Sequence, residues 1–64
     1  MTARRYRIVN PGVLFAPDRR VDFTHAAPLG SVVLLRVDGR PVTVLLAGYP
    51  VGGRLAAELL VTYL

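Results

Sequence analysis

Asp22, His25 and Ser31 supply the three residue types of a hydrolytic triad within ten positions of each other. A serine hydroxyl becomes nucleophilic when a histidine takes its proton and a carboxylate orients that histidine. The glycines of the Gly-x-Ser-x-Gly turn, which exposes the nucleophile in many hydrolases, do not surround Ser31. A chain of 64 residues is also short for a pocket that shelters a reaction. We therefore expect ordinary strand and turn residues here, and a protein that is not an enzyme.

The sequence lacks a complete set of residues for a metal, cofactor or phosphate site. Asp18, Asp22 and His25 match no metal-binding loop, and one histidine without any cysteine cannot build a structural zinc site. Gly48 and the pair Gly52-Gly53 lack the lysine and the spacing of phosphate-binding loops. The sequence therefore predicts no metal, no cofactor and no small-molecule substrate.

A basic segment near the N-terminus suggests a different chemistry, the binding of nucleic acid. Guanidinium groups bind phosphates, and an aromatic ring between them can stack on a base. Two further arginines flank a turn of a β-ribbon, an element that can enter a groove of DNA. In the alternative interpretation, the arginines only keep a hydrophobic chain soluble. The residues predicted to contact nucleic acid or another anion are Arg4, Arg5, Tyr6, Arg7, Arg36 and Arg40.

The composition indicates a protein partner. The chain is 53% hydrophobic and 19% charged, with a net charge of +4, whereas average domains have about 25% charged residues. So short a chain buries only about 60% of its unfolded surface. Without cysteine or a metal site, oligomerisation is the remaining means of stabilisation.

The N-terminal region does not resemble a targeting segment. Asn10-Pro11-Gly12 interrupts the apolar run that would follow the basic residues of a signal peptide. No run of apolar residues reaches the length of a membrane span. We expect intracellular synthesis, with incorporation in a particle as one outcome, and no membrane partner.

The element that should organise the fold is a hairpin over residues 32–47. Asp38-Gly39 supplies the positive φ angles of a type I′ turn, and the arms are rich in Val and Leu. Because both faces of the arms are largely apolar, we expect one face inside the chain and the other against a helix of its own or another chain. In the first arm the faces are Val33, Leu35, Val37 and Val32, Leu34, Arg36; in the second they are Val42, Val44, Leu46 and Thr43, Leu45, Ala47.

Shorter strands are expected on both sides of this hairpin. Residues 5–10 alternate, with Tyr6 and Ile8 on one face, and a turn at residues 10–12 leads to a short apolar strand at 13–16 that would complete a first hairpin. A further strand covers residues 21–25, and residues 26–30 and 48–53 are predicted loops. Residues 54–64 are ambiguous. As a helix they carry one polar stripe, as a strand one apolar face, and we predict a helix with a strand as the alternative.

Together these features predict a single domain of residues 1–64 that is mainly β. It would be a small barrel or sandwich of about five antiparallel strands, with a short C-terminal helix or a last strand. The expected function is that of a non-enzymatic structural or assembly protein, which forms a homo-oligomer or clamps a larger complex, such as a small virion or cementing subunit. The predicted assembly interface consists of Val32, Leu34, Leu45, Leu59 and Tyr63.

Two alternatives remain open. One is a small basic β-barrel that binds nucleic acid or regulates a nucleic-acid machine. The other is a regulatory partner that adds a strand to the sheet edge of another protein.

Overall fold

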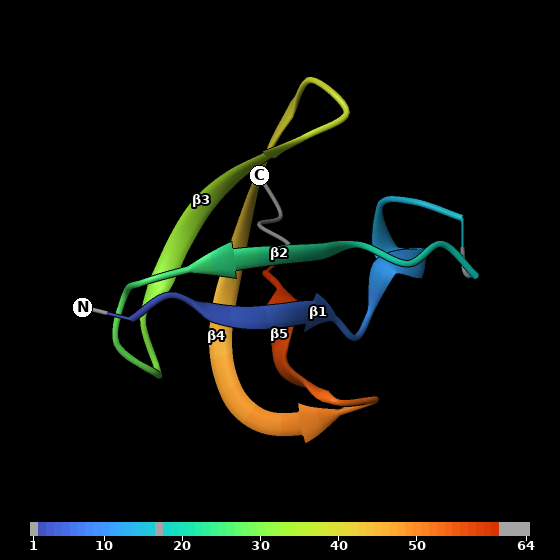
Figure 1. The fold of residues 1–64 in the computed structure, drawn as a ribbon. Helices are drawn as coiled ribbons and strands as arrows, with labels where there is room; N and C mark the ends of the chain where they lie inside the picture. The colour runs from blue at the N-terminus through green and yellow to red at the C-terminus, as the bar shows by residue number, and fades with distance from the viewer. Residues whose placement is uncertain (1, 17, 61–64) are drawn as a thin grey trace.

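A five-stranded sheet rolled into a half-barrel makes up most of the computed structural model, which describes residues 2–16 and 18–60 (Figure 1). In space the strands follow the order β2-β1-β5-β4-β3. The mainly β fold is therefore as the sequence predicts. The elements are β1 (Arg4–Ile8), a 3-10 helix (Pro11–Val13), β2 (Asp22–His25), β3 (Val32–Val37), β4 (Arg40–Val51) and β5 (Arg54–Leu59).

The predicted central hairpin is present as β3 and β4. Asp38 and Gly39 have φ angles of 52° and 78°, as a type I′ turn requires. Across the pair, Val37 is opposite Arg40 and Val32 is opposite Leu45. One face of the hairpin packs into the core, and the other points away from it. The core-facing residues are Val33, Leu35, Val37, Val42, Val44 and Leu46.

Strand β4 continues to Val51, so the loop predicted for residues 48–53 is wrong except for the turn at Gly52-Gly53. The register with β5 shifts between Leu46 and Pro50, and Gly48 between them has a φ of 84°. Such an irregularity bends a strand while it stays in the sheet. Figure 1 shows the resulting strong curvature of β4, which lets it pair along β5 on both sides of the bend.

The C-terminal segment is a strand over Arg54–Leu59, so the helix prediction is wrong there and the strand alternative is correct. Gly52 and Gly53 both have positive φ and form a two-residue turn that returns the chain beside β4. Strand β5 then pairs with β4 on one side and β1 on the other. Hydrogen bonding on both sides outweighs the high helix propensity of its Ala and Leu residues, because tertiary contacts override intrinsic propensity. Residues 61–64, the rest of the predicted helix, lie outside the described residues.

Strand β1 departs from the prediction in its partners. It pairs antiparallel with β2 and parallel with β5, so the sheet is mixed and not wholly antiparallel. The short strand predicted at residues 13–16 is replaced by the 3-10 helix, where the amides of Leu14 and Phe15 both donate to the Pro11 carbonyl. Because those amides are used locally, the antiparallel partner of β1 is instead β2, further along the chain.

The core forms on the concave side of the half-barrel. Tyr6 is fully buried, and its ring stacks on Phe23, directly opposite in β2, with centroids 5.4 Å apart. Within the described residues the Tyr6 hydroxyl has no hydrogen-bond partner. The buried cluster comprises Tyr6, Ile8, Val21, Val42, Val44, Leu46, Ala57 and Leu59.

Candidate functional site

The convex side of β3, β4 and β5 carries an exposed apolar surface. Val32, the first residue of β3, is 58% exposed, and Leu34 in the same strand is 70% exposed. Val32 lies opposite Leu45, and Leu34 lies opposite Thr43. On the other side of Thr43, the amide of Leu60 donates to the Thr43 carbonyl, and Leu60 is 39% exposed. We name Val32, Leu34, Leu45 and Leu60 the outer apolar patch.

Polar groups border the outer apolar patch. Glu58 is opposite Leu45, and the Tyr49 hydroxyl donates to its Oε1 at 2.7 Å. This hydrogen bond raises the pKa of Tyr49 and satisfies the carboxylate. At the hairpin end, Arg36 is opposite Pro41 and donates to the Gly39 carbonyl at 3.0 Å. An apolar centre with a polar border is the usual make-up of a protein interface.

The structure separates the residues predicted for an assembly interface. Val32, Leu34 and Leu45 share the outer apolar patch. Leu59 is 5% exposed and belongs to the core, because alternation along β5 turns every second residue inward. Leu59 is therefore not available on this surface, and Tyr63 lies outside the described residues. Sequence reasoning missed Leu60, which the same alternation would have indicated if residues 54–60 had been read as a strand.

The basic residues near the N-terminus do not form the interleaved patch that the sequence suggested. Arg4 and Arg5 are exposed, but Tyr6 is fully buried and is not available to stack on a base. Arg7 is bound to Asp22 by Nε to Oδ1 at 2.8 Å and Nη2 to Oδ2 at 3.3 Å. Side-chain alternation along β1 explains this arrangement, because the side chain of Tyr6 points inward and those of Arg5 and Arg7 point outward.

Asp22 is the centre of a charged cluster on the outer side of β1, β2 and β5. In addition to Arg7, the Arg54 Nε lies 3.4 Å from Asp22 Oδ2. The hydrogen bonds from Arg7, together with the charges of Arg54 and Arg20, lower the pKa of Asp22 below its ordinary value. Asp22 is thus held ionised, and its two carboxylate oxygens contact Arg7 and Arg54 and not His25.

The histidine of the hypothetical triad is also engaged elsewhere. His25 Nδ1 accepts a hydrogen bond from the Ala27 amide at 3.0 Å, and Ser31 lies directly before β3. Asp22 and His25 are three residues apart on one strand, so their side chains leave opposite faces of β2. In residues 2–16 and 18–60 no group of three or more His, Asp or Glu side chains converges on a metal position.

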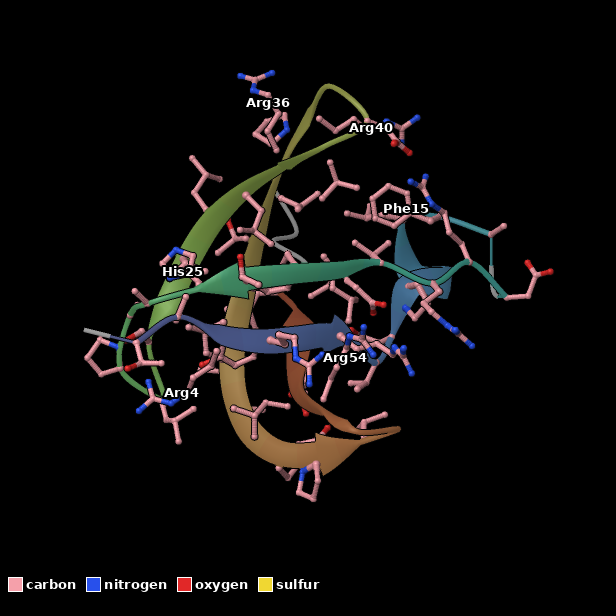
Figure 2. All side chains as sticks on the ribbon, viewed as in Figure 1. Arg4, Phe15, His25, Arg36, Arg40 and Arg54 are labelled. Atoms are coloured by element: carbon pink, nitrogen blue, oxygen red, sulfur yellow. The ribbon has the colours of Figure 1, made fainter. Side chains whose placement is uncertain are left out.

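The other arginines predicted to bind anions lie at the β3–β4 turn. Figure 2 shows Arg36 and Arg40 there, far from Arg4 near the start of β1. Arg40 Nη1 reaches the Leu14 carbonyl at 3.5 Å. Next to it, Arg19 forms an ion pair with Asp38, and its guanidinium lies 5.0 Å from the centre of the Phe15 ring. These contacts fasten the segment after β1 to the hairpin. The predicted anion-binding residues are thus divided between two ends of the molecule.

A groove lies between β2 and β3, at the opening of the half-barrel. Four apolar side chains and five charged ones line it. They are Val21, Phe23, Leu35 and Val37, with Arg19, Arg20, Asp22, Arg36 and Asp38.

Among the described residues no helix has the length and apolar character needed to cross a membrane. The chain matches no protein-family model, no curated protein and no solved structure.

Proposed function

We propose that this protein is a non-enzymatic assembly protein whose copies associate through the outer apolar patch. The observation that carries the proposal is the exposure of Val32 and Leu34 in a strand whose alternate residues fill the core. Removing such side chains from water stabilises an association by about 1.5–3 kcal/mol each. A domain of this size has a small core, so a covering neighbour adds substantially to its stability.

A second copy of the chain fits the outer apolar patch better than a charged partner does. In a two-fold symmetric contact the same surface meets itself, so any charge at its centre would repel its own copy. None of the four patch side chains is charged, and the adjoining Glu58 carboxylate, which accepts the hydrogen bond from Tyr49, lies at the border and not at the centre. Arg36 and Arg40 lie at the hairpin end, where solvent screens them.

Light scattering after gel filtration of the full chain tests this proposal. We expect a mass above the 7.0 kDa of one chain at micromolar concentrations, falling on dilution. Leu34→Glu should give single chains, because the contact would bury an unpaired carboxylate on each copy. Leu14→Glu is the matched control. Leu14 is an exposed leucine outside the sheet, and the same change there should leave the assembly intact. A wild-type mass of 7.0 kDa throughout this range would contradict the proposal.

The nucleic-acid alternative makes a different prediction for the same protein. Exposed arginines favour it, but the burial of Tyr6 and the separation of Arg4 from Arg36 weaken it. Binding to phosphates should weaken steeply between low and moderate salt, whereas association through apolar side chains should persist. A gel-shift titration with single-stranded and duplex DNA at two salt concentrations therefore separates the two functions.

A further inference from the structure

The two outermost strands of the sheet, β2 and β3, each have an edge without a strand partner in residues 2–16 and 18–60. On β3, the Leu46 amide donates to the Ser31 carbonyl, which identifies residues 31 and 46 as a hydrogen-bonded pair. Because such pairs alternate in an antiparallel ladder, residues 33, 35 and 37 bond to β4. The backbone N–H and C=O groups of Val32, Leu34 and Arg36 therefore point toward the open edge.

The same reasoning applies to β2. The Ile8 amide donates to the Val21 carbonyl, so residues 8 and 21 are a hydrogen-bonded pair, and residues 23 and 25 also bond to β1. The backbone groups of Asp22 and Thr24 point away from β1. In Figure 1, β2 and β3 diverge from the connection between them toward the β3–β4 turn. The groove described above lies between these two open edges.

The charges at the groove leave two cations without a carboxylate partner. Asp38 accepts hydrogen bonds from Arg19, and Asp22 is occupied by Arg7 and Arg54. In the described part of the chain, Arg20 and Arg36 form no ion pair. The groove therefore combines apolar walls, unpaired backbone groups and two guanidinium groups that take no part in the ion pairs of the described residues, one beside each open edge.

We infer that this groove binds an extended peptide segment in which apolar and acidic residues alternate, added as a strand to the open edge of β3. In an added strand, side chains point alternately to the two faces of the sheet. Those on the concave face would meet Leu35 and Phe23, and those on the convex face would lie beside Arg36. Carboxylates at the convex positions would form charge-assisted hydrogen bonds with the guanidinium groups. This site uses the backbone edge of β3, whereas the outer apolar patch uses side chains of the same strand, those of Val32 and Leu34.

The free edges favour a peptide over a nucleic acid. A polypeptide offers N–H and C=O groups at the repeat of a β-ladder, and main-chain bonding to an exposed sheet edge is an established mode of peptide recognition. A single-stranded nucleic acid would use the guanidinium groups and an exposed aromatic ring, but its sugar-phosphate backbone has no N–H donors for the edge carbonyls of Val32 and Leu34.

A backbone amide NMR titration of the isotope-labelled full chain tests this inference with three synthetic peptides of equal length. One alternates valine and glutamate, the second replaces glutamate by lysine, and the third is the glutamate peptide with N-methyl groups on all of its backbone amides. The glutamate peptide should bind, with its largest shift changes at the amides of Val32, Leu34 and Arg36. The lysine and N-methyl peptides should each bind about tenfold or more weakly, because they lose the charge pairing or the backbone bonds.

Charge-reversed variants locate the contact. Arg36→Glu and Arg20→Glu should each weaken binding of the glutamate peptide by about fivefold, the size expected for one exposed ion pair. Arg4→Glu makes the same change in net charge at the far end of the molecule and should leave binding unchanged (Figure 2). All three sites are exposed on the surface, so the fold should tolerate each change.

Three results would overturn the inference. The first is no shift change with the glutamate peptide at millimolar concentration. The second is equal binding of the N-methyl peptide, which would show that no strand is added. The third is tighter binding of oligothymidylate than of the glutamate peptide at the same amides, which would assign the groove to nucleic acid. These readouts report peptide binding, whereas the assembly test reports the oligomeric mass, so failure of one proposal can be told from failure of the other.

Discussion

Arg7 and Asp22 lie directly opposite each other in the β1–β2 pair, and two hydrogen bonds of 2.8 and 3.3 Å join their side chains. The chain brings these residues together across 15 positions. Arg54 approaches the same carboxylate from β5. The cluster therefore links three neighbouring strands of the half-barrel, including the parallel pair of β1 and β5.

This cluster predicts a specific dependence of stability on pH. The pKa of Asp22 is lower in the folded than in the unfolded chain, so the ionised carboxylate stabilises the fold. The contribution is fully present above the unfolded pKa of about 3.9 and is lost as the pH falls through the lower folded pKa. Asp22→Asn should therefore flatten the fall in unfolding free energy at acidic pH, measured by urea denaturation at a series of pH values.

A double-mutant cycle checks that Arg7 is the partner responsible. Arg7→Gln should flatten the same part of the pH profile, and the combined variant should lose little more than either single one. Identical acid profiles for the wild type and Asp22→Asn would show that the pair contributes nothing to stability.

Removing the buried hydroxyl group of Tyr6 should not lower the free energy of unfolding. It has no hydrogen-bond partner in the described residues, so Tyr6→Phe removes an unsatisfied polar group and keeps the stack on Phe23. We expect the free energy of unfolding to stay the same or to rise by up to about 1 kcal/mol. Tyr6→Ala should instead lower it by about 3–5 kcal/mol, because it leaves a large cavity. A clear loss in Tyr6→Phe, measured by urea denaturation, would reveal a partner for the hydroxyl, such as an ordered water.

Asn10 extends the pairing of β1 and β5 through its side chain. Its Nδ2 donates to the Leu59 carbonyl at 3.2 Å, and its Oδ1 accepts from the Leu59 amide at 2.8 Å. Asn10→Ala should lower the free energy of unfolding by about 1–3 kcal/mol, because two partly buried backbone groups lose their partners. Asn10→Asp should also destabilise, since a carboxylate oxygen would then face the Leu59 carbonyl oxygen.

Hydrogen exchange at the Leu59 amide gives a local readout of this contact. It should speed up in Asn10→Ala but not in Asp18→Asn, a change at an exposed residue outside the strands. Equal protection of Leu59 in Asn10→Ala and the wild type would mean that the side chain does not hold the strand end.

Glycine is required at position 39 because of its backbone conformation and not because neighbouring atoms leave no room for a side chain. Its φ is 78°, and a Cβ placed there would meet nothing within 4 Å. Gly39→Ala should therefore destabilise by about 1 kcal/mol through conformational strain alone. Gly39→Asn should cost less, because asparagine tolerates positive φ. Thermal unfolding of the two variants compares these costs, and a larger loss for Asn than for Ala would exclude this explanation.

Local features of this chain were readable from the sequence. The Asp38-Gly39 turn and the alternation in β3 and β4 predicted the hairpin, and the alternation of residues 5–10 placed Tyr6 and Ile8 on one face. Turn chemistry and the period of two depend on neighbouring residues only. The same alternation argued against grouping Tyr6 with Arg5 and Arg7, since consecutive residues of a strand point to opposite faces.

Long-range pairing decided what the sequence left ambiguous. Residues 54–59 satisfy a helical and a strand pattern, and only the hydrogen bonds from β4 and β1 on either side select the strand. That selection then places Leu59 in the core and Leu60 on the surface. The parallel match of β1 with β5 joins segments nearly fifty residues apart and leaves no local signature. Sequence alone therefore determined a two-faced apolar hairpin, whereas tertiary hydrogen bonding determined which of its residues meet solvent and which strand edges stay open.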